Sequence, residues 1–210
     1  MQIAIIGAGN VGGALAQGLA AKGHALTLGV RDAAKASELA AATGAALASP
    51  AAAAAEAEVI ILALPWRAAE AAVKGLGDLT GKIVIDCINP IGMVDGVLGL
   101  LVGHTTSGGE MVAGWLPGAR VVKTLNQVGA EVMATAAQMP ARPAMFMAGD
   151  DPAAKTAVAG LLTDLGFAPL DAGMLIRARI LETLAMVWIN QAVLRGMGRN
   201  WALSVTTKGE

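Results

Sequence analysis

Residues 2–13 read QIAIIGAGNVGG, an apolar run followed at once by a glycine-rich turn. The apolar run is typical of a buried β-strand, and the alanine-rich stretch that continues to Gly23 is typical of a helix. The turn therefore fits the pattern G-x-G-x-x-G between a strand and a helix, which is the context that a dinucleotide-binding site requires. Gly7 would permit the tight bend, Gly9 would let the backbone approach a diphosphate, and Gly12 would let the helix pack close to the strand. We expect the diphosphate to lie on the helix N-terminus, where unpaired amides favour an anion.

The first half of the chain repeats this alternation of short apolar runs and alanine-rich stretches. The predicted strands are 2–6, 24–29, 59–64, 82–86 and 120–123, and the predicted helices are 10–22, 66–74, a helix that Asp32 caps, and a short helix over 51–57 behind Ser49 and Pro50. Residues 90–107 are predicted to form a long glycine-rich loop. The alternation is typical of βαβ units around a parallel sheet.

The chain after Asn126 is predicted to be a small extension of the same body. Its predicted elements are a helix at 129–137, a strand at 144–148, a helix at 152–165, a strand at 167–170 and a helix at about 175–197. Apolar residues of the last helix form a stripe that either closes the core or faces a second subunit. The sequence thus predicts an α/β fold, with a Rossmann doubly wound, mostly parallel sheet at 1–126. A small C-terminal α/β portion at 127–210, ending in a long helix, is expected to carry the substrate pocket and the dimer contacts.

Composition narrows the class of function. A net charge of −1 does not indicate a basic surface for nucleic acid. The sequence contains no long apolar block free of polar residues, so no membrane span is predicted. The single cysteine, Cys87, has no partner for a disulfide, and no cysteine and histidine cluster has the spacing of a metal site. A strand that begins at residue 2 leaves no room for a secretory signal, so a cytoplasmic protein without metal is expected.

The end of the second predicted strand indicates which dinucleotide binds. NAD sites usually place Asp or Glu there, whereas this chain has Leu28-Gly29-Val30-Arg31. Arg31 can pair with a 2′-phosphate and stack on adenine, and Lys35 can add a second charge. NADP(H) is therefore predicted, although Asp32 partly offsets these charges.

The nicotinamide is expected among the tips of the later strands. Asn89 and Asn126 are candidate partners for a ribose or carboxamide, although an asparagine at such a place is as often a turn former. The complete predicted cofactor-binding set is Gly7, Ala8, Gly9, Asn10, Val11, Gly12, Val30, Arg31, Lys35, Leu64, Pro65, Trp66, Asn89, Pro90 and Asn126.

A general acid is harder to find in this sequence. The chain has no tyrosine, which excludes the Tyr and Lys pair of short-chain dehydrogenases. His24 lies at the start of the second predicted strand, at the edge of the sheet opposite the cofactor, and is expected to be structural. His104 and Lys123 are the remaining candidates for a catalytic proton donor, and each also fits a structural role. The shortage of donors favours a hydride acceptor that needs no protein acid, such as a flavin or deazaflavin ring.

Several of these segments together resemble the coenzyme F420-dependent NADP oxidoreductases. The segments are 7–12, Gly29-Val30-Arg31, Leu64-Pro65-Trp66, 121–126 and Pro169-Leu170-Asp171-Ala172-Gly173, and the resemblance continues into the last predicted helix. The cytosolic domain of the STEAP-type membrane ferric reductases is similar in its core. Val30 stands where the family often has serine or threonine, which removes one phosphate hydrogen bond.

The resemblance implies a homodimeric NADPH-dependent oxidoreductase that exchanges a hydride between NADP(H) and a deazaflavin stacked on its nicotinamide. It also implies that Arg31 and Lys35 hold the 2′-phosphate, and that Pro65 and Trp66 border the stacked rings. Coenzyme F420 or a flavin would be the second substrate.

Two other functions remain open from the residues. One is an NADP-dependent reductase of 2-hydroxyacids, ketoacids or imines, but those enzymes normally follow the N-terminal unit with a larger helical domain, whereas residues 127–210 contain two further predicted strands. The other is a non-catalytic NADP-sensing module. A buried dinucleotide with no open face beside the nicotinamide would favour that function.

Overall fold

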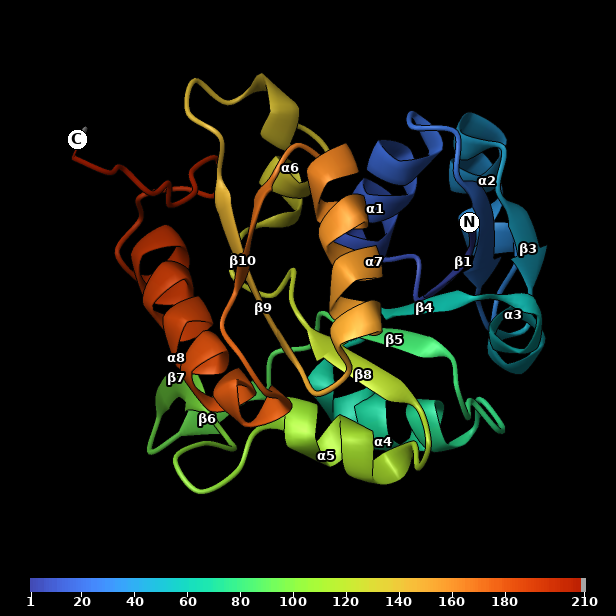
Figure 1. Cartoon of the computed structure of the whole chain (residues 1–210), viewed down its shortest axis with the longest axis horizontal. Helices are drawn as coiled ribbons and strands as arrows, with labels where there is room; N and C mark the ends of the chain where they lie inside the picture. The colour runs from blue at the N-terminus through green and yellow to red at the C-terminus, as the bar shows by residue number, and fades with distance from the viewer. Residues whose placement is uncertain (209–210) are drawn as a thin grey trace.

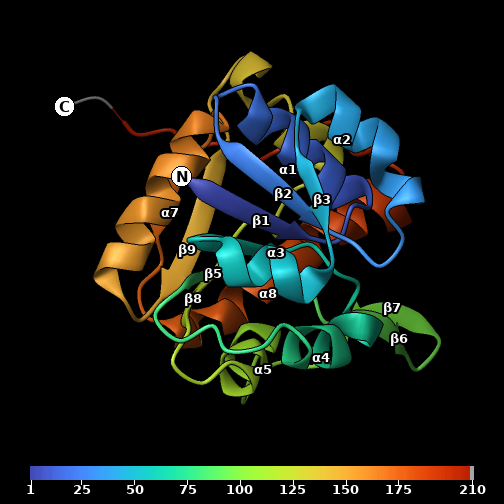
Figure 2. The same cartoon turned by 90° about the vertical axis from the view of Figure 1, so that its right-hand side faces the viewer.

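The computed structural model describes residues 1–208, which form a twisted eight-stranded sheet with helices on both faces and a separate two-stranded sheet (Figures 1 and 2). The strand order is β10-β9-β8-β5-β4-β1-β2-β3. The parallel part of this sheet consists of β1 (Gln2–Ile6), β2 (Ala25–Gly29), β3 (Ala46–Ala48), β4 (Val59–Leu62), β5 (Ile83–Asp86) and β8 (Arg120–Lys123). Because the chain winds outward from β1 in both directions, the order is that of a doubly wound Rossmann sheet.

The C-terminal extension continues this sheet. Strand β9 (Ala144–Gly149) pairs antiparallel with β8, and β10 (Ala168–Asp171) pairs parallel with β9. Helix α7 (Pro152–Asp164) connects the two strands and lies along one face (Figure 1). The predicted α/β class and the mostly parallel sheet are therefore confirmed.

Two apolar clusters hold the helices against the two faces of the sheet. One cluster lies under α1 (Asn10–Ala20), α2 (Ser37–Thr43), α6 (Ala130–Met133) and α7, and the other lies under α3 (Pro50–Glu56), α4 (Trp66–Lys74) and α5 (Gly108–Trp115). Alternate residues of β1 serve the two clusters, since Ile3 and Ile5 join the first while Ala4 and Ile6 join the second. Burial on both faces explains why this strand is apolar without interruption.

Some predicted boundaries needed correction. The loop expected at 90–107 contains a hairpin, β6 (Ile91–Val94) and β7 (Val97–Leu100), and helix α5 and strand β3 were not predicted. Asp32 accepts a hydrogen bond from the Ala34 amide at 3.2 Å, which is a local turn contact, and it caps neither the 3-10 turn at 34–36, whose N-cap is Ala33, nor α2, whose N-cap is Ala36. The helix expected at 129–137 is short because Thr135 leaves the helical region at φ −127°. Ser49 does cap α3, as its hydroxyl accepts from the Ala52 amide at 3.3 Å.

The long C-terminal helix is interrupted at both ends. A 3-10 turn at 175–177 precedes α8 (Ala178–Ile189), and a π turn at 190–194 follows it. The chain then folds back, because Gly196 and Gly198 take positive φ and the Trp188 indole donates to the Trp201 carbonyl at 3.0 Å. Among residues 1–208, we found no helix with the length and apolar character needed to cross a membrane.

Candidate functional site

The turn after β1 requires glycine at two of its positions. Gly7 has φ +102°, and a Cβ there would lie 2.5 Å from the Ala63 carbonyl oxygen. A Cβ on Gly12 would lie 1.8 Å from the Gly7 carbonyl oxygen, so any side chain would push α1 away from the turn. These contacts give the first and third glycines of the pattern the roles that the sequence predicted.

The middle glycine faces open space at the start of α1. A Cβ on Gly9 would have no heavy atom within 4 Å. Gly9 is also the N-cap residue of α1, it offers no side chain to cap the first-turn amides, and that turn holds no acidic residue. Uncapped amides and the positive end of the helix dipole together form a site for an anion.

A cavity of about 800 Å³ opens beside this turn, at the carboxyl ends of β1, β2 and β4. Its wall contains Gly7, Ala8, Gly9, Val30, Arg31, Lys35, Leu64 and Pro65 from the predicted set. The predicted residues Asn10, Val11, Gly12, Trp66, Asn89, Pro90 and Asn126 are not part of its wall. The cavity lies where the strand order reverses, which is the usual ligand position in such sheets.

Part of the cavity wall was missed in the sequence. Pro50 and the alanines at 68, 71 and 72 of α4 also line it. The three alanines have the i, i+3, i+4 spacing of one helix face, a signal that was readable but looked like ordinary helix composition. Their small side chains leave this part of the cavity wall smooth and apolar.

Two positively charged side chains, Arg31 and Lys35, follow the tip of β2 and line the cavity. Lys35 extends into solvent with 85% of its side chain exposed and lies 3.5 Å from the Asp32 carboxylate. Arg31 forms no ion pair with any residue in the range 1–208. A free guanidinium, an uncapped helix and an open glycine turn are the features that NADP(H) needs, so the residues present fit this cofactor.

The tip of β4 carries an aromatic residue beside the cavity. Trp66 begins α4, directly after Pro65 of the cavity wall, and stacks on Trp115 of α5 with ring centroids 5.6 Å apart and an interplanar angle of 30°. The stack fixes the first turn of α4 against α5. It therefore fixes the Leu64–Pro65 edge of the cavity.

Asn89 and Asn126 contact each other and not the cavity. The Asn89 amide donates to the Asn126 carbonyl at 2.8 Å, and the Asn126 amide donates to Asn89 Oδ1 at 3.1 Å and to the Leu181 carbonyl at 3.2 Å. Asn126 is buried, and its Oδ1 accepts from Gln127. Their polar groups thus join the loops after β5 and β8 to α8.

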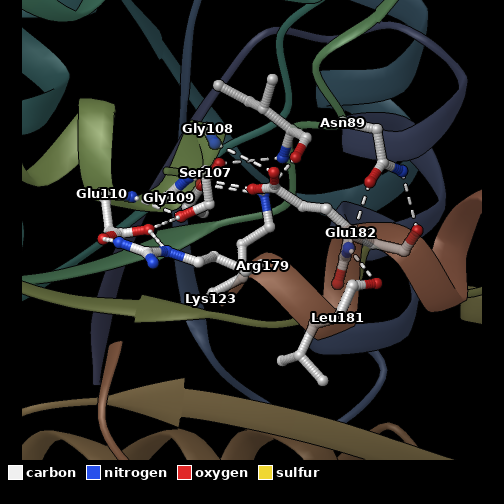
Figure 3. Close-up of polar contacts among 12 residues, drawn as sticks. Asn89, Ser107, Gly108, Gly109, Glu110, Lys123, Arg179, Leu181 and Glu182 are labelled. Carbon is white, nitrogen blue, oxygen red and sulfur yellow. Dashed lines mark hydrogen bonds and ion pairs between the residues drawn. The ribbon is translucent and has the colours of Figure 1, made fainter. Parts of the chain in front are cut away.

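The two candidate proton donors differ sharply in access. The Lys123 side chain is 0% exposed and lies 3.0 Å from the Asp86 carboxylate and 3.0 Å from the Glu182 carboxylate. Figure 3 shows Lys123 beside Glu182. Burial by itself would lower the pKa of Lys123, but the two carboxylates outweigh it and hold that pKa above its ordinary value. A buried, doubly paired ammonium cannot reach a substrate. His104 is exposed in the loop before α5, at φ +62°.

His24 and Cys87 lie outside the cavity wall, and each has contacts that fit a structural role. His24 Nε2 lies 2.9 Å from Asp164 Oδ2, as expected of a structural histidine that joins the start of β2 to α7. Cys87 is buried, and desolvation raises the pKa of its thiol, so it is not a ready nucleophile.

The apolar stripe of the last helix is largely on the surface. Ile176, Ile180, Val187 and Leu194 are each about half exposed, whereas Leu181 and Trp188 are buried. The exposed members lie outside the core, which removes the first of the two roles considered for them. A homodimer through this helix stays a prediction.

Comparison with known proteins points to the same class of cofactor. Residues 2–90 match the family described as NADP oxidoreductase, coenzyme F420-dependent. A protein from Arthrobacter sp. FB24, named provisionally as an F420-dependent NADP reductase, is 34% identical over 99% of this chain and 100% of its own, with a TM-score of 0.90. A hypothetical protein from Sinorhizobium meliloti is 32% identical over 85% of this chain and 88% of its own, with a TM-score of 0.75.

A more distant likeness concerns the fold alone. A reductive aminase from Aspergillus terreus, solved with NADPH and ethyl levulinate, is 22% identical over 93% of this chain and 62% of its own, with a TM-score of 0.69.

Proposed function

This chain belongs to the coenzyme F420-dependent NADP oxidoreductase family, and from that premise we propose that it transfers a hydride between NADP(H) and a deazaflavin or flavin-like acceptor. The observation that carries the proposal is the cavity itself, whose wall contains both the uncapped N-terminus of α1 and Arg31, an arginine without an ion pair among the described residues. Bound NADP(H) supplies the hydride chemistry, and the chain supplies binding and orientation.

The binding residues divide the dinucleotide into parts. First-turn amides of α1 would hold the diphosphate above Gly9, and Arg31 with Lys35 would hold the 2′-phosphate. The alanine face of α4 would cover the adenine, and Leu64 and Pro65 would border the path toward the nicotinamide. A single rigid edge of the sheet would thus fix both ends of the ligand.

The acceptor is argued from the donors that the site offers. A carbonyl or imine acceptor gains a proton as well as a hydride, and a protein acid usually supplies it. Lys123 is buried in ion pairs and the chain has no tyrosine, which leaves exposed His104 as the only candidate that the sequence offered. A deazaflavin or flavin ring needs no such acid, and positioning alone can then carry much of the rate.

A panel of acceptors tests the proposal. NADPH oxidation is followed with coenzyme F420, FMN, a ferric chelate, ketoacids and cyclic imines. We expect turnover with coenzyme F420 or FMN. Turnover with ketoacids or imines alone would assign the chain to the carbonyl and imine reductases, and tight NADPH binding without any turnover would assign it to the sensing modules.

Arg31→Ala should weaken NADPH binding selectively. The loss of a charge-assisted hydrogen bond of about 1.5–3 kcal/mol corresponds to roughly tenfold to a hundredfold in affinity, whereas NADH has no 2′-phosphate to lose. Calorimetric titration of both dinucleotides measures the difference. Arg142→Ala, which removes an exposed arginine outside the cavity wall, is the matched control and should change neither affinity. Equal weakening of NADPH and NADH by Arg31→Ala would show that Arg31 does not read the phosphate.

A further inference from the structure

Three charged side chains meet in the interior, away from the cavity wall. Lys123, Asp86 and Glu182 are each at most 1% exposed, and the Lys123 ammonium lies 3.0 Å from each of the two carboxylates. Its contact with Glu182 is drawn in Figure 3. The ammonium also donates to the Ile88 carbonyl. Lys123 and Asp86 end neighbouring strands, β8 and β5, whereas Glu182 comes from α8.

Glu182 has a second set of partners that the ion pair does not require. Its carboxylate accepts from the backbone amides of Gly108 and Gly109, each at 2.9 Å. Gly108 and Gly109 are the first two residues of helix α5, so the Glu182 carboxylate is the anion that binds at the N-terminus of this helix. Gly108 also allows a close approach, because a Cβ there would lie 3.1 Å from Glu182 Oε1 and 3.3 Å from the Pro90 ring, and one of these neighbours would have to shift.

The loop after β5 is therefore held by contacts with β8, with the start of α5 and, through Asn126, with α8. Its Ile88 carbonyl is bound by Lys123, its Pro90 ring packs on Gly108, and Asn89 pairs with Asn126, which is itself bound to the Leu181 carbonyl of α8. The loop also begins beside the cavity edge, since the Cys87 amide donates to the Leu62 carbonyl at the end of β4. Glu182, through Lys123, and Leu181, through Asn126, thus connect α8 to a loop that begins beside Leu62 at the end of β4.

Stability gives a poor account of such a cluster. Burying charges costs desolvation energy that ion pairs often only balance, and apolar side chains of the same size would frequently serve as well. The cluster also carries one more negative than positive charge, which the two α5 amides offset. What the cluster supplies beyond burial is a fixed geometry among β5, β8, α5 and α8.

We propose that Glu182 is a positioning residue for hydride transfer. By binding the Lys123 ammonium and the α5 amides at the same time, it holds the loop at 87–90 against the nicotinamide end of the cavity. The proposal rests on the proposed function, because it takes the nicotinamide to lie at the tips of β4, β5 and β8. It assigns no chemical step to Glu182 itself. The diphosphate and 2′-phosphate contacts lie around Gly9 and Arg31, on other strands, and should not depend on it.

Glu182→Gln is the test, because it keeps the shape of the side chain and leaves Lys123 paired with Asp86. The variant should bind NADPH within about twofold of the wild type, while kcat with coenzyme F420 falls on the order of tenfold to a hundredfold, as small misplacements of reacting groups can cause. The deuterium isotope effect on kcat, measured with NADPH labelled at the transferred position, should rise. The fluorescence of the bound nicotinamide should shift toward that of free NADPH.

Glu110→Gln is the matched control. Glu110 also joins α5 to α8, through a pair with Arg179 at 2.6 and 2.8 Å, but it is partly exposed and does not contact the loop at 87–90. The Arg179 guanidinium holds the pKa of the Glu110 carboxyl below its ordinary value, so this pair is charged at neutral pH. The control should lower the thermal midpoint slightly and leave kcat and nicotinamide fluorescence unchanged.

The outcomes separate the possibilities. Equal loss of kcat in both variants, or a Glu182→Gln loss that matches its folded fraction, would reduce Glu182 to a structural contact and overturn the proposal. A parallel loss of NADPH affinity and kcat would overturn it as well. Should Glu182→Gln not fold, Glu182→Asp keeps the charge but shortens the reach, and the same split is expected at smaller size. If wild-type protein reduces no acceptor, the proposed function fails, while nicotinamide fluorescence still tests the positioning role.

Discussion

Replacing Gly9 with alanine is expected to leave the chain folded and to lower its affinity for NADPH at least about a hundredfold. Gly9 has φ −77° and ψ −164°, a conformation open to alanine, and its Cβ would meet no protein atom within 4 Å. The methyl group would instead enter the cavity above the first turn of α1, where the diphosphate is proposed to lie. Losing two charge-assisted hydrogen bonds of about 1.5–3 kcal/mol each would account for that change.

Two other glycines make this result interpretable. Gly160→Ala, on the exposed side of α7 with equally open space, should keep NADPH affinity and stabilise the helix by up to about 1 kcal/mol. Gly12→Ala would also abolish binding, but through the clash with the Gly7 carbonyl, and so it would say nothing about the ligand. Calorimetry and thermal unfolding of the variants give both readouts. Unchanged NADPH binding by Gly9→Ala would remove the diphosphate from this turn.

The glycine turn and the tip of β2 were predictable as parts of the candidate site because their information is local. A strand, three glycines and a helix start within a dozen residues dictate both the bend and the uncapped amides, and Arg31 follows the next strand directly. The fold was predictable for a related reason. Each apolar run is short and each alanine-rich stretch is bounded by a cap or a glycine, as with Ser49 before α3 and Gly23 after α1.

The hairpin at 91–100 was missed although its signal was present. Asp95 and Gly96 both take positive φ, at 50° and 80°, and an Asp-Gly pair between apolar residues is a strong hairpin signal. The other glycines nearby made the whole segment look like a loop.

The nicotinamide half was less predictable because its contacts are not local. Lys123 lies at a strand tip, where a catalytic lysine would also lie. Only the packing of α8 shows that the Lys123 ammonium is bound by the Glu182 carboxylate and is not available to a substrate. Asn89 and Asn126 likewise have the placement of cofactor ligands, yet they pair with each other. A side chain at a strand end can face the ligand or a neighbouring loop, and one sequence does not distinguish these two directions.

Lys123→Met is expected to destabilise the fold by about 3–5 kcal/mol, the usual cost of removing one partner from a buried ion pair. Methionine nearly fills the same volume, so the loss would come from charge and not from a cavity. Asp86 and Glu182 would face each other without a cation, in a place where neither is more than 1% exposed. In a chain of this size the thermal midpoint should fall on the order of 10 °C.

A charge-balanced variant separates the electrostatic cause from any lost packing. Lys123→Met combined with Asp86→Asn and Glu182→Gln removes all three charges, and it should recover much of the stability that Lys123→Met loses, because neutral groups avoid the desolvation cost. Urea unfolding of both variants measures the difference. If Lys123→Met alone stays within about 1 kcal/mol of the wild type, the two carboxylates are not held charged around that ammonium. Since the position of the loop at 87–90 is argued to depend on the same ion pairs, that result would also remove the grip through which Glu182 is proposed to act.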